Sequence, residues 1–175
     1  MTIIGDTHED GGAKDDGSEP DRLDNLDLSR TAANSEGELI TGLPFGREIG
    51  MRLHQAGAGV AVLSVPYDER LVGDPETGVL HGGVITALLD TACGWAVMAT
   101  PAKLKSTATL DLRIDYMRPA TAGKAVFSRA ECYRLTRSIA FARAVAYHAD
   151  PQDPVATAQV AFILDRVDDP KEPSR

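Results

Sequence analysis

One segment of this chain has the apolar spacing of a long helix, and the segments that follow it alternate as strands do. From Gly82 to about Ala99 apolar residues recur at three- and four-residue intervals, and Pro101 follows the run. These residues are Ile85, Leu88, Leu89, Ala92 and Ala96. A helix that is apolar on most of its sides must also be covered on most of its sides, which limits the folds that the chain can adopt.

The sequence after the helix predicts four strands. In "STATLDLRIDYMRP" apolar and polar residues alternate, which predicts a strand with one buried face. The predicted buried face carries Ala108, Leu110, Leu112, Ile114 and Tyr116, and the opposite face carries Thr107, Thr109, Asp111, Arg113 and Asp115. The segments "GKAVFSRAECYRLTRS", "IAFARAVAYHAD" and "PVATAQVAFILD" continue as strands.

The sequence before the helix predicts a hairpin. "IGMRLHQAGAGVAVLSVPY" contains two extended segments that are separated by the glycines of "QAGAG", and the loop "LVGDPETGVL" follows. The order is therefore two strands, one helix and four strands. It predicts an α+β fold in which a curved antiparallel sheet of about five to six strands wraps around one long central helix.

The formal net charge of −8 is concentrated near the N-terminus. Residues 1–40 carry three basic and eleven acidic side chains, whereas the remaining 135 residues carry 15 of each sign. Residues 1–40 also lack aromatic side chains, and we expect a disordered acidic tail there, a folded domain over residues 41–167 and a short tail over 168–175. A folded part without net charge lacks the basic surface of a nucleic-acid-binding protein.

Several classes of protein have no motif in this sequence. Two cysteines, Cys93 and Cys132, and four scattered histidines form no metal-binding spacing, so neither a metal nor a cofactor is expected. The sequence has no leader with a basic start and an apolar stretch, and no run of about 18 apolar residues, so we expect a cytoplasmic protein that does not bind membranes. It has no Gly-x-Ser-x-Gly motif of a serine hydrolase.

Asp90 is the unusual residue of the predicted helix. Its neighbours at three and four positions are Thr86, Ala87, Cys93 and Gly94, and none of them is a cation. A carboxylate that is poorly solvated and unpaired is a stronger base, and is a candidate for general-base catalysis. The alternative is an Asp that simply reaches water at an edge or an interface, as isolated Asp residues in helices usually do.

The motif "HGG", residues 81–83, stands where the helix begins. Free backbone N–H groups at a helix N-terminus, together with the positive end of the helix dipole, stabilise negative charge. Glycines at positions 82 and 83 would let a substrate carbonyl approach these groups, as an oxyanion hole requires. The alternative is a tight turn with His81 as the helix cap.

The spacing of Gly82 and Asp90 bears on how the two could act together. Eight residues separate them, which is about 12 Å along a helix. A base has to reach a water molecule that is itself about 3 Å from the carbonyl. One chain therefore does not supply both groups to one substrate. A two-fold dimer with antiparallel helices would form two sites, each with Gly82 of one chain and Asp90 of the other.

The motif "HGG", an Asp nine residues after the His, and the strand "TATLDLRIDYMRPA" together resemble the hotdog-fold acyl-CoA thioesterases, in particular the phenylacetyl-CoA thioesterase-like (PaaI-type) group. The resemblance covers about residues 45–165. It implies a hotdog fold, homodimers and often homotetramers built as dimers of dimers. It also implies an enzyme that hydrolyses an acyl-CoA thioester to a free acid and coenzyme A, without a metal or a redox cofactor.

The resemblance also implies roles for single residues. Asp90 matches the catalytic carboxylate, which acts as a general base on water or as a nucleophile. Gly82 matches the glycine whose amide polarises the thioester carbonyl, and Gly83 lies next to it at the binding site. His81 matches the His that shapes the turn, and Thr109 matches a Ser or Thr that helps to hold the attacking water.

The substrate-binding loop departs from the family pattern. The family often has an Asn six residues before the His, but position 75 is Pro here and Asp74 lies one place earlier. Asp74 can correspond to that Asn only with a one-residue insertion, and an ionised Asp cannot donate as an amide does. For the phosphates of coenzyme A the candidates are Arg118, Arg134 and Arg137, whose alternative role is solubilising surface charge.

Two other functions are open at this point. Some hotdog proteins bind or sense acyl-CoA without turnover. Hotdog dehydratases or hydratases place a Glu, or an Asp with a His, on the central helix, whereas only Asp90 and Cys93 are titratable between His81 and Lys103 here. Cys93 has no basic partner in the sequence, and we expect a small core residue.

Overall fold

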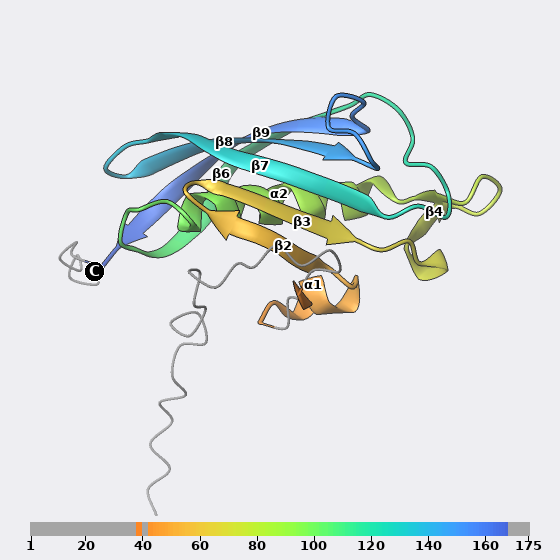
Figure 1. The fold of residues 1–175 in the computed structure, drawn as a ribbon, viewed down its shortest axis with the longest axis horizontal. Coiled ribbons are helices and arrows are strands. Elements are labelled where there is room, and N and C mark those ends of the chain that lie inside the picture. The colour runs from red at the N-terminus through yellow and green to blue at the C-terminus, as the bar shows by residue number, and fades with distance from the viewer. Residues whose placement is uncertain (1–37, 40–41, 168–175) are drawn as a thin grey trace, which may run out of the picture.

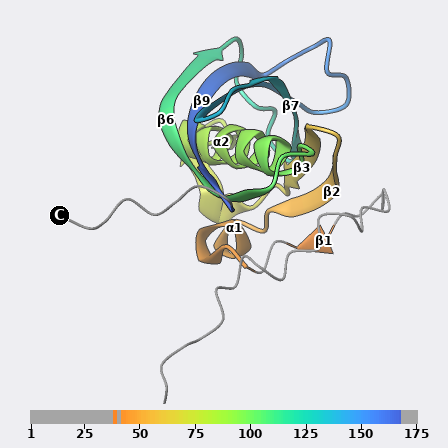
Figure 2. The ribbon, with the colours of Figure 1, turned by 90° about the vertical axis from the view of Figure 1, so that its left-hand side faces the viewer.

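A seven-stranded antiparallel sheet curves around the long helix α2 (Gly82–Met98). The computed structural model describes residues 38–39 and 42–167. The sheet lies across the molecule in Figure 1, and the turned view in Figure 2 has strands around most sides of α2. The predicted fold class, one central helix wrapped by a curved antiparallel sheet, is confirmed.

The order of the elements also agrees with the prediction over most of the chain. In chain order they are β1 (Glu38–Leu39), α1 (Pro44–Glu48), β2 (Arg52–Gly57), β3 (Val60–Val65), a 3-10 turn (Glu69–Leu71), β4 (Val72–Asp74), β5 (Val79–Leu80), α2, β6 (Leu104–Tyr116), β7 (Val126–Leu135), β8 (Ile139–Tyr147) and β9 (Ala156–Arg166). The hairpin β2–β3 precedes the helix and the four strands β6–β9 follow it, as the sequence predicts.

Strand β6 lies at one edge of the sheet. The order is β1-β2-β3-β7-β8-β9-β6, and all neighbours are antiparallel. Within the described part of the chain, β6 pairs only with β9, so its other edge carries backbone groups without a neighbouring strand. At 13 residues it is also the longest strand.

The core forms between α2 and the inner face of the sheet. Eight residues of α2 are buried, at helical spacing. On β8 every second residue is a buried alanine, and these residues are Ala140, Ala142, Ala144 and Ala146. Since successive strand residues point to opposite faces, the alanines form one inner row. Their short side chains allow the sheet to curve close to the helix at normal packing density.

Strand β6 contains a bulge at Leu110. Thr109 lies opposite Phe162 of β9, whereas Asp111 lies opposite the next residue, Ala161. Leu110 therefore has no partner in the ladder. Phe162 is buried and faces α2, because a Cβ on Gly94 of that helix would lie 3.8 Å from the Phe162 ring. Since directly opposed residues share a face, Thr109 also points towards α2.

The bulge makes the predicted buried face of β6 wrong in part. Leu112 and Ile114 pack against the core as predicted. Ala108 and Leu110, which precede the register shift, are exposed. Tyr116 lies on the same face as Leu112 and Ile114, opposite the buried Ala156, but is exposed at the end of the strand. Thr109 was expected on the opposite, solvent-facing side and instead faces the helix, because one unpaired residue reverses the alternation.

Some short elements are absent from the sequence prediction. Helix α1 has five residues and begins at Pro44, and β4 and β5 form a small hairpin inside the predicted loop. Elements this short have too few residues for a periodic pattern. The predicted tails over residues 1–40 and 168–175 lie outside the described residues, except for Glu38–Leu39, which form β1.

Candidate active site

His81 caps the N-terminus of α2. Its ring Nδ1 accepts a hydrogen bond from the Gly83 N–H at 2.9 Å, and its carbonyl accepts one from the Val84 N–H at 2.9 Å. Among the described residues no acceptor is found for the Gly82 N–H, which is the first amide of the helix. A free donor at the positive end of the helix dipole is therefore available to a ligand, and His81 is the helix cap that the alternative interpretation of the "HGG" motif predicted.

The two glycines of the motif have different surroundings. A Cβ on Gly83 would lie 2.9 Å from His81 Nδ1, so a side chain there would disturb the cap. The atoms nearest to a Cβ on Gly82 would belong to the Tyr116 side chain, at ordinary contact distances of 3.5 to 3.7 Å. The lack of a side chain at Gly83 is thus explained by the His81 cap, whereas at Gly82 it leaves the amide accessible from outside.

Asp90 lies half-buried in the middle of α2, beside Thr109. The Thr109 hydroxyl donates to Asp90 Oδ1 at 2.9 Å, which is possible because the bulge in β6 turns Thr109 towards the helix. The ion pairs found among the described residues do not include Asp90. The structure therefore brings together two of the predicted site residues around a carboxylate that has no cation as partner.

Tyr116 is a site residue that the sequence pattern assigned to the core. It is 52% exposed, and its hydroxyl donates to the Gly82 carbonyl at 2.9 Å. Thr86 Oγ1 lies 2.7 Å from the same hydroxyl and also donates to the Gly82 carbonyl, at 3.2 Å. Sequence alternation could not reveal this contact, because it joins residues 34 positions apart.

An open pocket of about 400 Å³ lies beside the N-terminus of α2. Gly82 and Tyr116 line it together with the apolar side chains of Leu80, Ile85 and Met117. The free Gly82 amide and an apolar surface thus adjoin, and this combination suits a carbonyl group that carries an apolar substituent.

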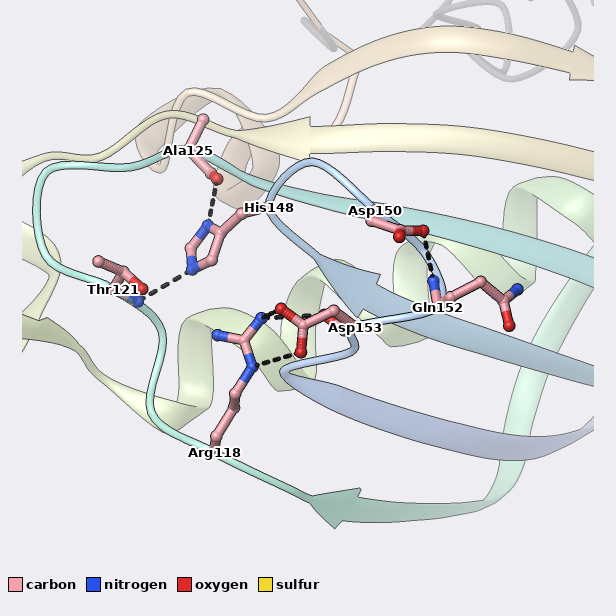
Figure 3. A network of polar contacts seen from close by, with 7 residues as sticks. All are labelled: Arg118, Thr121, Ala125, His148, Asp150, Gln152 and Asp153. Carbon is pink, nitrogen blue, oxygen red and sulfur yellow. Dashed lines mark hydrogen bonds and ion pairs between the residues drawn. The ribbon is translucent and has the colours of Figure 1, made fainter.

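The segment between β6 and β7 is held by two side chains, shown in Figure 3. Arg118 donates through Nε to Asp153 Oδ1 at 3.2 Å and through Nη2 to Asp153 Oδ2 at 2.8 Å. His148 accepts from the Thr121 N–H at 2.9 Å, and its other ring nitrogen lies 2.8 Å from the Ala125 carbonyl. Arg118 lines the pocket, but its guanidinium is engaged with Asp153. Its predicted contact with a coenzyme A phosphate stays a prediction.

Of the other predicted substrate-binding residues, Asp74 lies on β4, which pairs with β5 just before α2, and the two arginines lie at the far end of the sheet. Asp74 holds its own turn: it accepts from the Glu76 N–H and, at 2.6 Å, from the Thr77 hydroxyl. These bonds, first of all the one from Thr77, keep the pKa of Asp74 below its usual value. Arg134 and Arg137 lie at the end of the sheet near Leu104. Leu135 pairs with Ala140, and the start of β8 pairs with the part of β9 that lies beside the Leu104 end of β6. Asp74 therefore neighbours the start of α2, whereas Arg134 and Arg137 do not.

Cys93 is fully buried in α2, three residues after Asp90. Burial raises the pKa of its thiol well above the usual range, and the charge of Asp90 raises it further. A thiol that stays protonated is a poor nucleophile, in agreement with the predicted core role. In the described part of the chain no three His, Cys, Asp or Glu side chains gather as metal ligands, and no helix has the length and apolarity to cross a membrane.

Comparison with known proteins points to one family. The model of the thioesterase superfamily matches residues 77–155, from β5 to the segment before β9. The medium/long-chain acyl-CoA thioesterase YigI of Escherichia coli (strain K12) is 29% identical over 135 residues, which are 70% of this chain and 86% of that protein.

Solved structures agree with this match. A crystal structure of a protein from Pseudomonas aeruginosa is 40% identical, with a TM-score of 0.64, and the match covers 71% of this chain and 93% of that one. A mutant of the phenylacetic acid degradation protein PaaI from Thermus thermophilus is 27% identical, with a TM-score of 0.62, and the match covers 71% of this chain and all of that one. The matched residues 77–155 include Gly82, Asp90, Thr109 and Tyr116.

Proposed function

Because this chain belongs to the thioesterase superfamily, we propose that it hydrolyses an acyl-CoA thioester to a free acid and coenzyme A. The proposal rests above all on the half-buried Asp90, which is hydrogen-bonded to Thr109 and has no cation as partner among the described residues. The Escherichia coli relative is named for medium- and long-chain acyl-CoA esters, so these esters are the first substrates to test.

The first part of the proposed mechanism is carbonyl polarisation at Gly82. The thioester carbonyl oxygen would accept a hydrogen bond from the Gly82 N–H, while the adjoining pocket holds an apolar part of the ester. Negative charge grows on that oxygen as water adds to the carbonyl carbon. A donor that is already oriented towards this charge typically contributes about 10²- to 10³-fold to kcat.

The second part is activation of water by Asp90. Thr109 donates to Oδ1, which leaves Oδ2 to accept a proton from the attacking water. The water oxygen bonds to the carbonyl carbon, the C–S bond then breaks, and the sulfur of coenzyme A leaves with the bonding electrons and takes up a proton. Attack by Asp90 itself, through an anhydride, is the other form of this step, and transfer of ¹⁸O from labelled water into the Asp90 side chain during turnover would reveal it.

A homodimer would bring the two parts together. Gly82 and Asp90 are the first and ninth residues of α2, about 12 Å apart along the axis. Each is also tied to β6, Gly82 through Tyr116 and Asp90 through Thr109. Antiparallel pairing of two free β6 edges about an axis near Leu112 would bring Tyr116 of one chain beside Thr109 of the other. Gly82 and Asp90 of different chains would then face one substrate, and each dimer would have two sites.

The test is thiol release from a panel of aliphatic and aryl acyl-CoA esters, with wild type and Asp90→Asn compared. We expect turnover by the wild type and a loss of about a hundredfold or more in kcat for the variant, the scale of general-base catalysis. The near-isosteric amide keeps an acceptor for Thr109 but is not a base. Tight binding of acyl-CoA by both proteins without any turnover would show a binding or sensing protein and overturn the proposal.

A further inference from the structure

The Gly82 carbonyl is bonded by hydroxyl groups from two different elements. Tyr116 reaches it from the end of β6, at 2.9 Å, and Thr86 reaches it from the next turn of α2, at 3.2 Å. The two hydroxyls also lie 2.7 Å from each other. The three oxygen atoms thus lie within hydrogen-bond distance of one another where the helix begins, and the two hydroxyl hydrogens serve these three contacts.

The first turn of α2 has few other constraints on its direction. Its first two residues are glycines, whose backbones are the most flexible of all residues. His81 holds the amides of Gly83 and Val84, but Gly82 has no hydrogen bond on its own amide within the described residues. The Gly82 N–H lies in one peptide plane with the His81 carbonyl, which the Val84 N–H holds, so the contacts on the Gly82 carbonyl restrain the other side of this residue.

Simple packing does not explain the Tyr116 hydroxyl. The side chain is 52% exposed, so a phenylalanine would keep the same ring contact with Gly82, and the hydroxyl could bond to water instead. The hydroxyl points to the carbonyl of the residue whose N–H is available to a ligand. A mobile Gly82 would present this N–H in many directions, and catalysis by an oxyanion donor depends on a fixed one.

We infer that Tyr116 is a positioning residue for thioester hydrolysis: together with Thr86 it holds the Gly82 carbonyl, so that Gly82 is held on both sides of its Cα and its N–H stays in place against the substrate. The inference rests on the proposed function. Tyr116 acts through Gly82 and not by contact with the reacting atoms. Its loss therefore weakens stabilisation of the transition state more than it weakens binding of the ester.

The direct test is Tyr116→Phe, which removes one oxygen atom and keeps the ring. For the ester that the wild type hydrolyses fastest, we expect kcat to fall about fivefold and KM to change by less than about twofold, on the scale of one neutral hydrogen bond. Tyr133→Phe is the matched control, because Tyr133 is equally exposed at 51% but lies on β7, near the Phe141 ring. It should leave kcat, KM and Tm unchanged.

A second pair of variants covers the case in which Tyr116→Phe alters the fold. Thr86→Ser keeps the hydroxyl and should retain most of kcat, whereas Thr86→Val keeps the shape and should lower it. Since both hydroxyls act on one carbonyl, the double variant Tyr116→Phe, Thr86→Val should lose less than the product of the single losses.

A spectroscopic measurement separates positioning from general stability. In a ¹³C-labelled ketone analogue of the ester, a methylene replaces the sulfur, so the probe binds without being cleaved. Its C=O stretch should shift to lower frequency on wild type, because the Gly82 N–H polarises it, and should shift less on Tyr116→Phe. An unchanged kcat with an unchanged shift would overturn the inference, and so would a raised KM with normal kcat, which would indicate direct contact with the ester.

The two proposals fail in different ways. Without turnover of any ester by the wild type, the proposed function is wrong and the inference falls with it. With normal wild-type turnover and no effect of Tyr116→Phe or Thr86→Val on kcat or on the carbonyl stretch, only the inference is wrong.

Discussion

At the N-terminus of α2, neighbouring residues have different tasks. His81 caps the helix, Gly83 provides space for that cap, and Gly82 keeps a free amide next to an apolar pocket. In the sequence these three residues form a single motif, "HGG". The structure separates them into groups that support the helix end and one group that is free to bind.

Gly82→Pro should remove the free amide without disturbing the helix. Position 82 is the first helical residue, where proline is well accepted, and His81 has φ −60° and ψ 135°, which a residue before proline favours. We expect kcat to fall by about 10²- to 10³-fold, as for loss of an oxyanion donor, with Tm little changed. Gly82→Ala keeps the N–H and adds only a methyl group against Tyr116, so it separates loss of the N–H from the effect of added bulk. Equal activity of the proline and alanine variants would contradict the role of this amide.

His81→Ala should lower the free energy of unfolding by about 1 kcal/mol, as is typical for loss of an N-cap side chain. His81→Asn, a good N-cap residue, should restore most of that loss, as measured by urea denaturation of both variants. If alanine and asparagine are equally stable at this position, the ring nitrogen does not contribute as a cap.

At the scale of elements, β6 determines the geometry of the site. Both candidate groups on α2 are tied to this one strand, Asp90 through Thr109 and Gly82 through Tyr116. The bulge at Leu110 makes the first of these contacts possible. The strand is also one of the two outer strands of the sheet in the described part of the chain, so an interface formed there would lie next to both contacts.

Sequence reasoning predicted the regular elements and missed the irregular ones. Helical spacing predicted α2 to within about a residue, and alternation predicted β7, β8 and β9. The bulge is a single unpaired residue inside an apparently perfect alternation, so the pattern gave the wrong face for Thr109. The contact between Asp90 and Thr109 agrees with the family resemblance and not with the alternation. Tyr116 was missed because hydrogen bonds between distant segments leave no periodic signal.

Leu110→Lys should weaken association of the protein into dimers. Leu110 is 56% exposed on the free-edge strand, and lysine on an edge disfavours pairing with another strand. We expect the dissociation constant of the dimer to rise at least about tenfold, a cost of about 1.4 kcal/mol, when measured by sedimentation equilibrium. Thioesterase activity should fall at low protein concentration and recover at high concentration.

Ile163→Lys provides the comparison. Ile163 is 46% exposed, but it lies on β9, which has a neighbouring strand on both sides. It should leave association unchanged. Loss of dimers in this variant alone would move the interface from the edge to the outer face of the sheet.

At the scale of the whole molecule, the free Gly82 amide and the Asp90 carboxylate of a single chain are too far apart along α2 to act on one thioester. If both act, the functional unit has at least two chains, and each chain contributes to two sites. This division of labour is testable without a structure of the assembly.

Mixed dimers should regain activity that neither parent has. Gly82→Pro and Asp90→Asn, mixed after dissociation in equal amounts, should form heterodimers in which one site combines the intact Gly82 of one chain with the intact Asp90 of the other. Half of the dimers would be mixed and half of their sites active, which gives about a quarter of wild-type activity for a two-fold dimer with shared sites. If each chain used its own Gly82 and Asp90, the mixture would stay inactive. Native mass spectrometry of the mixture measures the fraction of heterodimers.

The attachment of both groups to one edge strand has a consequence for the kinetics of the assembled protein. If two β6 strands paired two residues out of register, every Gly82 would move about 7 Å relative to the opposing Asp90. Both sites would be affected at once, since one strand carries both contacts. Preparations that contain misaligned dimers should therefore behave as a mixture of fully active and inactive molecules, with reduced kcat per chain and an unaltered KM.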